Sequence, residues 1–533
     1  MTPARFCSHA AAPEDPRTMF APLPTPDEMS NWDRTCMETY GPSGAILMEN
    51  ASREAFHVLS LHFGELKGRR AVIFAGAGNN GGDAFALARQ LWNHDAKVMI
   101  LHTKEREEYS GDSAYHMDLA LKLDIPCFYL PEYNLEFLKK IDIIVDGLLG
   151  TGFRSPLSEE SQKWIKAINE LGKNSFVLSL DIPSGIDGTT GIPSPVAVCA
   201  NVTVTFEAAK LGLFLPPSRD YVGHLIVKKI GIPKIIKSQL PSSHVALTEK
   251  ILRNFPMPHT TMHKGEAGHV LILGGSEALT GAPLLSALGA IRSGAGLVTI
   301  GSPRGLIHDI KSGWPDIMGL PLGTGRQWSR ACMEELKPHL TRFSSVVFGP
   351  GLGRDQGAMD FLNAYLEIPN PRTLFDADAL YFLAQNQDLM HKVPNTSIVT
   401  PHPGEMSRFF DVTAKEINAD RTAYVRKFTQ KFNMNILLKG AATIISDGND
   451  PIYISPFATP NLALGGSGDV LSGIIATLLA RDITPLMAAQ LGVYWHGLCG
   501  QILARDFPFR GNLAQEIAHT LPKALKEWND AQS

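Results

Sequence analysis

Short apolar segments with the character of β-strands alternate with amphipathic helical segments along almost the whole chain. In the first half, helical segments such as 83–93 and 161–171 separate the strands. This alternation predicts βαβ units and a mostly parallel sheet with helices on both faces. The strands expected in this half are 71–75, 97–102, 141–146, 176–182, 201–206 and 224–230.

The alternation pauses over residues 233–263, where prolines, serines and polar residues show little periodicity. It resumes with expected strands at 269–273, 296–300, 345–348, 373–375, 397–399, 435–438 and 443–446. We therefore predict an α/β protein with a Rossmann-like three-layer α/β/α domain over residues 21–240 and a second α/β/α domain over residues 241–533. Residues 1–20 are expected to form a loose extension, and Met1 and Met19 are both candidate initiators.

The composition gives no general attraction for polyanions. A formal net charge of -4 provides no electrostatic reason to expect binding to nucleic acid or to an anionic membrane. No apolar run approaches the roughly 18 residues that span a bilayer. The six cysteines are far apart and form no CxxC pair, which favours a reduced, cytoplasmic protein over a disulfide-bonded or zinc-binding one.

A glycine-rich segment, GAGNNGGD at 76–83, follows one expected strand and opens a helix. Glycines permit tight turns and bring backbone amides close to a phosphate, and the helix N-terminus adds positive potential. The segment contains GxGxxG, but a Rossmann domain for hydride transfer would carry an acidic residue at the end of the next strand. That strand ends in LHT at 101–103, and Glu105 comes late, so this alternative is disfavoured. In a purely structural interpretation, Asp83 caps the helix.

Two more expected strands end in glycine-rich segments, DGLLGTG at 146–152 and DIPSGIDG at 181–188. Because ligands bind at the carboxyl ends of parallel strands, we expect the glycine-rich segments to converge on one crevice. Asn80, Asp146 and Ser184 offer oxygen atoms, which suit a hard monovalent or divalent cation. Alternatively, Asp146 and Asp181 only cap helices or satisfy loop amides.

These motifs, together with LMENA at 47–51, VDG at 145–147 and GTGF at 150–153, resemble the NAD(P)HX epimerase (YjeF N-terminal) family over most of residues 22–232. The resemblance implies that Asn80, Asp146 and Ser184 bind a potassium ion, and that Asp181 is the candidate catalytic acid or base. Ala84 stands where the family usually has glycine, and its methyl group is expected to narrow the pocket mouth. The implied binding residues for the hydrated dinucleotide are Asn79, Asn80, Gly81, Gly82, Asp83, Gly150, Thr151, Gly152, Phe153, Arg154, Ser155, Pro156 and Asp181.

In the second half, the segment NLALGGSGDVLSG at 461–473 contains a glycine-rich turn that opens a helix. Free amides around Gly466–Asp469 can stabilise a developing negative charge. Asp469, at the same helix start, is placed to take a proton from a hydroxyl group next to a phosphate. The structural alternative is a helix N-cap aspartate after a flexible loop.

Three segments upstream also lie at expected strand ends: KGAAT at 439–443, TPHPGE at 400–405 and DADAL at 376–380. A lysine after a buried strand suits phosphate binding as a point charge. His402, between two prolines, is either structural or functional. Glu405 either organises magnesium through water or begins the next helix.

This set resembles the ribokinase-like superfamily and, within it, the ADP/ATP-dependent NAD(P)H-hydrate dehydratase (YjeF C-terminal) family over roughly residues 245–525. Further matching stretches are HKG at 263–265, TGA at 280–282, SGAGL at 293–297 and GPGLG at 349–353. The resemblance implies that Asp469 is catalytic, that Ala282, Gly351, His402 and Asp469 contact the hydrated cofactor, and that magnesium accompanies ADP or ATP. The implied nucleotide-binding residues are Lys439, Gly440, Ala441, Ala442, Thr443 and Gly468.

The two resemblances together predict an enzyme that repairs hydrated NADH and NADPH. The first domain would interconvert the R and S hydrates, and the second would dehydrate the S form with ADP or ATP, releasing AMP or ADP and phosphate. Two alternatives remain: the second domain is a small-molecule kinase, and the first is a non-catalytic binding module. We expect small-molecule substrates, no nucleic-acid or membrane partner, and a homo-oligomer.

Overall fold

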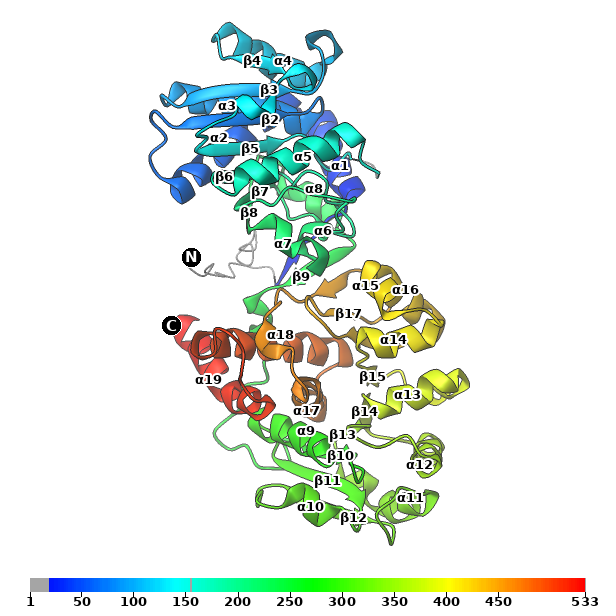
Figure 1. Cartoon of the computed structure of the whole chain (residues 1–533). Coiled ribbons are helices and arrows are strands. Elements are labelled where there is room, and N and C mark those ends of the chain that lie inside the picture. The colour runs from blue at the N-terminus through cyan, green and yellow to red at the C-terminus, as the bar shows by residue number, and fades with distance from the viewer. Residues whose placement is uncertain (1–18, 154–155, 533) are drawn as a thin grey trace. The chain divides into compact units, whose positions relative to one another are not determined.

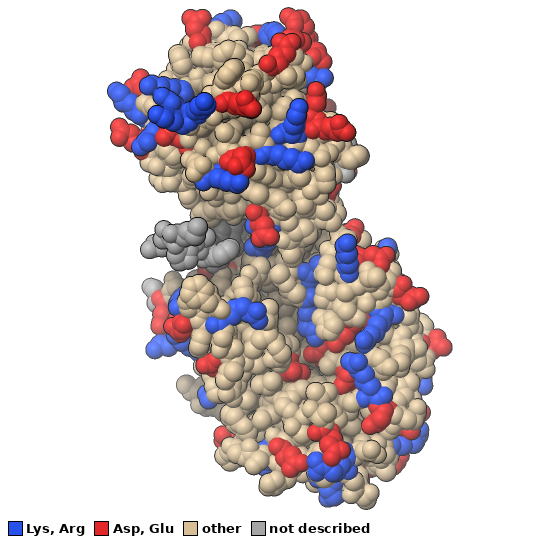
Figure 2. Space-filling model, in the orientation of Figure 1, with Lys and Arg blue, Asp and Glu red and all other residues tan. Residues whose placement is uncertain are grey.

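The computed structural model describes residues 19–153 and 156–532. The chain divides into two compact units, Met1–Val245 and Ala246–Ser533, each an α/β assembly (Figure 1). No helix within the described ranges has the length and apolar character needed to cross a membrane. Acidic and basic side chains are interspersed over the visible face of both units (Figure 2), as the nearly balanced composition suggests.

The first unit is built on a 7-stranded sheet in the order β4-β3-β2-β5-β6-β7-β8, with every adjacent pair parallel. Strands β3 and β4 are added on one side of β2 and strands β5 to β8 on the other, so the topological switch lies between β2 and β5. A crevice at the carboxyl ends of these two strands is the expected ligand site. The strands are β2 (Arg70–Ala75), β3 (Lys97–His102), β4 (Cys127–Tyr129), β5 (Ile143–Gly147), β6 (Phe176–Leu180), β7 (Val202–Phe206) and β8 (His224–Lys228).

Alternating side chains of the central strands enter two separate cores, as the two-residue period of a strand requires. On β2, Ile73 packs with residues of helices α1 to α4, whereas Val72 and Phe74 pack with residues of α5. The helices are α1 (Pro26–Thr35), α2 (Gly44–Phe63), α3 (Asn79–Asn93), α4 (Gly111–Lys122), α5 (Glu159–Gly172), α6 (Leu211–Phe214), α7 (Arg219–Val222) and α8 (Lys234–Gln239). Two short strands are β1 (Phe20–Pro22) and β9 (His244–Leu247), and Leu23 N donates to the carbonyl of His244 at 2.9 Å.

The second unit contains a mixed sheet with the run β12-β11-β10-β13-β14-β15-β16-β17-β18, in which the pairs β16–β17 and β17–β18 are antiparallel and the other pairs are parallel. Here the topological switch lies between β10 and β13. The strands are β10 (His269–Leu273), β11 (Leu297–Pro303), β12 (Met318–Leu322), β13 (Ser345–Phe348), β14 (Arg372–Phe375), β15 (Ile398–Val399), β16 (Asn435–Leu438), β17 (Ile444–Ser446) and β18 (Ile452–Ile454).

Helices α9 (Gly281–Arg292) and α17 (Ser467–Ala480) pack in close contact because glycine stands at the crossing on each helix. A Cβ at Gly473 would lie 2.0 Å from the carbonyl oxygen of Ser286, and one at Gly289 would lie 2.3 Å from that of Val470. This contact fixes the helix that carries Asp469. The remaining helices are α10 (Ile307–Lys311), α11 (Arg330–Leu336), α12 (Gln356–Leu366), α13 (Asp378–Gln385), α14 (Pro403–Phe410), α15 (Ala414–Ala419), α16 (Arg421–Phe432), α18 (Pro485–Asp506) and α19 (Ala514–Gln532).

The predicted α/β class with two layered sheets is confirmed. The expected strands 97–102, 269–273, 345–348 and 435–438 have the observed bounds, and the others differ at their ends. The sequence did not predict β1, β4, β9, β12 or β18, and β9 lies within residues 233–263, where the alternation was expected to pause. Strand β12 contains Gly319 and Pro321, which weaken a strand pattern, and β4 is short and only partly buried. Residues 1–18 of the expected loose extension lie outside the described residues.

Candidate active sites

A cavity of about 1000 Å³ opens at the carboxyl ends of β2, β5 and β6 in the first unit. Of the predicted site residues, Asn79, Asn80, Asp83, Gly150, Thr151, Gly152, Phe153 and Asp181 line it. Gly81, Gly82, Asp146, Ser184 and Pro156 are not among its lining residues, and Arg154 and Ser155 lie outside the described residues. The topology therefore gathers most of the predicted residues around one cavity.

The glycines of the NNGGD segment let the start of α3 approach the loop before it. A Cβ at Gly81 would lie 1.8 Å from the carbonyl oxygen of Gly76, and one at Gly82 would lie 2.4 Å from Sδ of Met48. The helix begins at Asn79 with Gly78 as its N-cap, so the interpretation of Asp83 as the helix cap is wrong. Asp83 lies one turn inside the helix and faces the cavity.

Ala84 does not narrow the pocket mouth, contrary to the sequence-based expectation. Its side chain is fully buried and is not part of the cavity lining. The methyl group instead fills space beside Gly147 on β5, where an added Cβ would come within 2.6 Å of it.

Asp146 and Ser184 form a buried network below the cavity. Ser184 donates to Asp146 through its hydroxyl group (2.5 Å) and its backbone amide (2.9 Å), and the Ser179 hydroxyl donates at 2.8 Å. Burial raises the pKa of Asp146, and these hydrogen bonds oppose the rise. Asp146 lies within β5 and caps no helix, whereas its acceptance of loop amides matches the structural alternative.

Asn80 adds an oxygen atom that has no internal partner. Its Nδ2 donates to the carbonyl of Leu149 at 2.8 Å, but its buried Oδ1 accepts no hydrogen bond. Leu149 N in turn donates to the Ser184 hydroxyl at 2.9 Å, so the loop after β5 links the two residues. A cation that prefers oxygen ligands would satisfy Asn80 Oδ1. No cluster of three or more His, Cys, Asp or Glu side chains suited to a metal occurs among the described residues.

Asp181 is held by a lysine that the sequence analysis did not identify. Lys210, which is 1% exposed, forms an ion pair with Asp181 Oδ1 and donates to Thr205 Oγ1 and to the carbonyl of Phe206 at 3.1 Å each. Asp181 has a positive φ of 58° and also accepts from Phe206 N at 3.2 Å. The only signal in the sequence was a lysine four residues after the end of an apolar strand.

Four further carboxyl groups line the same cavity, those of Asp33, Asp83, Asp112 and Glu160, and burial acts on the pKa of the first two. Burial raises the pKa of Asp33 to about 6, with Lys210 lowering it and Asp181 and Glu207 raising it. Burial also raises the pKa of Asp83 well above its ordinary value, with a contribution from Asp181. Neither side chain has a hydrogen-bond or ion-pair partner among the described residues, so the cavity holds more carboxyl groups than cations.

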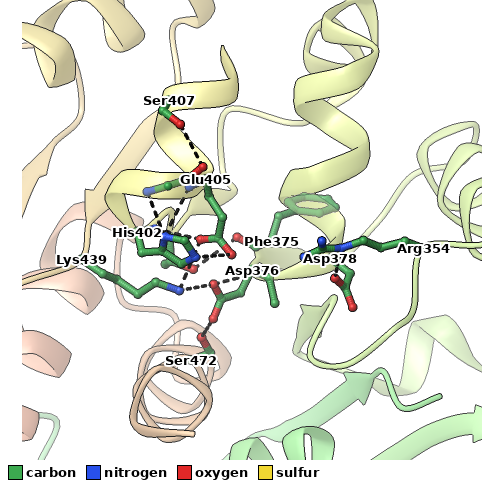
Figure 3. Close-up of polar contacts among 12 residues, drawn as sticks. Arg354, Phe375, Asp376, Asp378, His402, Glu405, Ser407, Lys439 and Ser472 are labelled. Carbon is green, nitrogen blue, oxygen red and sulfur yellow. Dashed lines mark hydrogen bonds and ion pairs between the residues drawn. The ribbon is translucent and has the colours of Figure 1, made fainter. Parts of the chain in front are cut away.

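In the second unit, one buried carboxylate organises the predicted phosphate site (Figure 3). Asp376, directly after β14, binds Lys439 Nζ through Oδ1 (2.5 Å) and accepts from Ser472 Oγ through Oδ2 (2.7 Å). Glu405 Oε2 lies 3.8 Å from Lys439 Nζ. Although burial opposes it, Asp376 and Glu405 raise the pKa of Lys439, so this lysine is a cation.

Asp469 lies beside this cluster at the third position of α17, whose N-cap is Gly466 with a φ of 87°. It is therefore not the N-cap residue. Burial and Asp376 raise the pKa of Asp469 to about 7, and Lys439 opposes the rise. A Cβ at Gly468 would lie 3.5 Å from Lys439 Nζ, so glycine leaves the space between the helix start and the lysine open.

His402 is the N-cap of α14 and forms a capping box with Glu405. Its Nδ1 accepts from Gly404 N at 3.0 Å, while Glu405 Oε2 accepts from His402 N at 2.8 Å. Figure 3 shows His402 beside Glu405. The His402 side chain is 55% exposed, so the ring serves the helix start and still faces solvent. Burial and Lys439 lower the pKa of His402, which keeps it neutral at pH 7.

The KGAAT segment depends on Arg421, which the sequence analysis also missed. The Arg421 guanidinium, 4% exposed, donates to the carbonyls of Leu438 (3.1 Å) and Lys439 (3.0 Å) and to that of Ala441. In this turn Ala442 is buried with a φ of 51°, and the other members, Gly440, Ala441 and Thr443, are at least partly exposed.

Elsewhere in the unit, a Cβ at Gly351 would lie 3.3 Å from that of Ala282, so these two predicted residues are neighbours.

Comparisons with known proteins match both units. Residues 44–212 match the family described as YjeF-related protein N-terminus, and residues 270–523 match NAD(P)H-hydrate dehydratase. The chain is 35% identical to the bifunctional NAD(P)H-hydrate repair enzyme Nnr of Moorella thermoacetica over 95% of this chain and 96% of that one. It is 30% identical to the enzyme of the same name from Escherichia coli over 94% and 93%. A solved ADP/ATP-dependent NAD(P)H-hydrate dehydratase from Bacillus subtilis, co-crystallised with ATP and Mg²⁺, is 28% identical, covers 53% of this chain and 97% of its own, and has a TM-score of 0.44.

Proposed function

The chain belongs to the family of bifunctional NAD(P)H-hydrate repair enzymes, and we propose that it epimerises R- and S-NAD(P)HX and dehydrates the S form with ADP or ATP. Residues 21–240 would form the epimerase domain and residues 241–533 the dehydratase domain. The observation that carries the proposal is full-length similarity combined with two separate carboxylate sites, one in each unit. The expected cytoplasmic location and homo-oligomeric state belong to the same proposal.

In the first site, the hydrated nicotinamide would occupy the cavity lined by Asn79, Asp83, the loop Gly150–Phe153 and Asp181. Asn80, Asp146 and Ser184 would hold a potassium ion, and the unpartnered Asn80 Oδ1 supports this assignment. The ion would supply positive charge near the substrate. The residues of the cavity would ease departure and return of the hydroxyl group at C6, which exchanges the two configurations.

In the second site, Asp469 would act as the general base. It would remove the proton of the C6 hydroxyl as that oxygen attacks the terminal phosphorus of ADP or ATP, and the bond from this phosphorus to the bridging oxygen would break. Lys439 and the amides of Gly466–Gly468 would stabilise the transferred charge. The lone pair of the ring nitrogen would then expel phosphate, and loss of a proton from C5 would restore the double bond. AMP or ADP and phosphate are the other products.

Several other residues would position the substrates of this step. Ala282, Gly351 and His402 would contact the hydrated cofactor, and Gly440–Thr443 with Gly468 would contact the nucleotide. Magnesium would bind the nucleotide phosphates, and the carboxylates of Asp376 and Glu405 near Lys439 are suited to orient its water ligands. The pKa of Asp469, raised to about 7 by burial and Asp376, supports a base that works near neutral pH.

The deciding experiment is an anaerobic assay of mixed R- and S-NADHX with the full chain and ADP, then ATP, followed through the absorbance of NADH. Complete recovery of NADH requires both activities. Recovery of only the S fraction would show that the first unit is a binding module. A stable phosphorylated product without NADH would show that the second unit is a kinase.

A further inference from the structure

The epimerase cavity contains one buried lysine and several carboxyl groups in different environments. Asp181 is paired with Lys210, which is itself fixed by Thr205 and by the carbonyl of Phe206. Asp83, from α3, is 9% exposed and faces the same cavity, yet its carboxyl group has no hydrogen-bond or ion-pair partner within the described ranges. A carboxyl group buried without a partner favours its neutral form, whereas one beside a cation favours the charged form.

We propose that Lys210 positions the Asp181 carboxylate through their buried ion pair and that Asp83 is the proton donor of the epimerisation. Two carboxyl groups whose environments differ in this way can divide the acid and base roles of one reaction. The inference rests on the proposed epimerase function and names the acid that the sequence motifs do not distinguish.

The chemical step balances with these groups alone. Asp83 donates its proton to the C6 hydroxyl as the C6–O bond breaks, and water leaves. The lone pair of N1 forms an N1=C6 iminium, whose positive charge the Asp181 carboxylate stabilises, while C5 keeps its hydrogens. Water then adds to the opposite face of C6 and returns its proton to Asp83.

Asp83 is a better donor than Asp33, the other carboxyl group of the cavity whose pKa burial raises. Asp33 lies on α1 and is only half-buried, whereas Asp83 is buried at the start of α3 beside the glycine-rich turn. Burial raises the pKa of both groups, that of Asp83 well above its ordinary value and that of Asp33 to about 6, so the choice between them rests on position and burial. The charged groups that act on Asp83 are Asp181, Lys210 and Asp33, and Glu207 acts in turn on Asp33. Lys104, Asp112 and Glu160 also line the cavity.

The chain also offers a matched control for Lys210. Lys237, on α8, forms a similar buried ion pair with Glu207, whose side chain is 1% exposed. Lys237 and Glu207 are absent from the cavity lining. Lys237→Met should therefore cost stability much as Lys210→Met does, but without changing the charge beside Asp181.

The test uses the full chain and R-NADHX, freed of the S epimer by prior dehydration. Conversion of R to S is followed by chromatography from pH 5 to 9 without ADP, and the spontaneous rate is subtracted at each pH. Dehydration of S-NADHX with ADP by the same samples serves as an internal control, since it uses the second unit.

For the wild-type chain, we expect a rate that falls on the basic side of the profile as Asp83 loses its proton. Lys210→Met should lower kcat about 100-fold with little change in the KM for R-NADHX, because Asp181 loses the group that positions it, whereas Lys237→Met should leave kcat in place at a similar loss of Tm. Asp83→Asn should lower the rate at least about 100-fold and abolish the basic limb, with S-NADHX dehydration unchanged.

An unchanged kcat in Lys210→Met, a basic limb retained in Asp83→Asn, or loss of that limb in Asp33→Asn instead would overturn the inference. Failure of the wild-type chain to epimerise at any pH would reject the proposed function on which the inference rests.

Discussion

Ser472 Oγ donates a hydrogen bond of 2.7 Å to Oδ2 of the buried Asp376 carboxylate. The other oxygen of this carboxylate binds Lys439, so a single side chain at the end of β14 links the helix that carries Asp469 to the lysine. Ser472 also donates to the carbonyl of Gly468 at 3.1 Å. Asp376 therefore fixes the position of the proposed general base Asp469 relative to the cation Lys439 before a nucleotide binds.

Ser472→Ala should lower both stability and dehydratase activity. Asp376 Oδ2 would be buried without its partner, which costs about 1–3 kcal/mol. We expect a lower Tm for the second unit and a KM for ADP raised several-fold, with epimerisation unchanged. Thr477→Ala is the control, because Thr477 lies on the same helix and donates to backbone carbonyls of Ala290 and Gly473. It should lose stability without a change in the KM for ADP.

Asp469→Asn should abolish dehydration and leave epimerisation intact. The amide cannot accept the hydroxyl proton, and loss of a general base typically lowers a rate by about 10²–10⁴-fold. The measurement is NADH formation from S-NADHX and ADP, alongside R to S conversion without ADP. Asp388→Asn, at an exposed position, controls for the substitution itself. Dehydration retained in Asp469→Asn would show that Asp469 is not the general base.

The same substitution should change stability in a pH-dependent way. Burial and Asp376 raise the pKa of Asp469 from 3.8 to about 7 in the folded chain. The folded state thus keeps a proton that the unfolded state has released, and this contribution to stability is fully present below pH 3.8 and lost as the pH rises through about 7. Asp469→Asn should therefore raise the Tm of the second unit at pH 8.5 by clearly more than at pH 5, where only part of the contribution has been lost, as thermal melts would show. The opposite trend would mean that Asp469 is stabilised as a carboxylate.

The strand ends were predictable from the sequence, whereas the ion pairs between them were not. Segments at expected strand ends located Asp181 and Asp376, and a glycine-rich turn at a helix start located Asp469, because each motif is local. Lys210 and Arg421 carry no local motif, and only the fold brings them beside Asp181 and under the KGAAT turn. The interpretation of Asp83 as a helix cap was wrong because α3 begins at Asn79, four residues earlier than the glycine pattern suggested.

Potassium should stabilise the first unit through Asn80. An ion that binds only the folded state at about 100 times its Kd adds about 2.7 kcal/mol to the free energy of unfolding. We expect the Tm of this unit to rise with potassium chloride relative to choline chloride at equal ionic strength, and the rise to disappear in Asn80→Ala. Asn79→Ala should keep it, because Asn79 is an exposed residue of the cavity wall. A rise of equal size in Asn80→Ala would place the ion elsewhere.

Ala84→Gly, which restores the residue usual in the related family, should not improve the epimerase. Ala84 is fully buried against Gly147 and does not face the cavity, so the substitution cannot widen the entrance. Glycine in a helix interior costs about 1 kcal/mol relative to alanine, and loss of the methyl group would leave a small void. We therefore expect a Tm several degrees lower for the first unit with KM for R-NADHX unchanged. The reciprocal change, Gly147→Ala, should be far more damaging, since its Cβ would lie 2.6 Å from that of Ala84 and 2.9 Å from the Asn80 carbonyl. The double variant Ala84→Gly with Gly147→Ala should regain part of the lost stability, which would identify the contact between the two residues as the cause. A lower KM for R-NADHX in Ala84→Gly alone would show that Ala84 does narrow the pocket mouth.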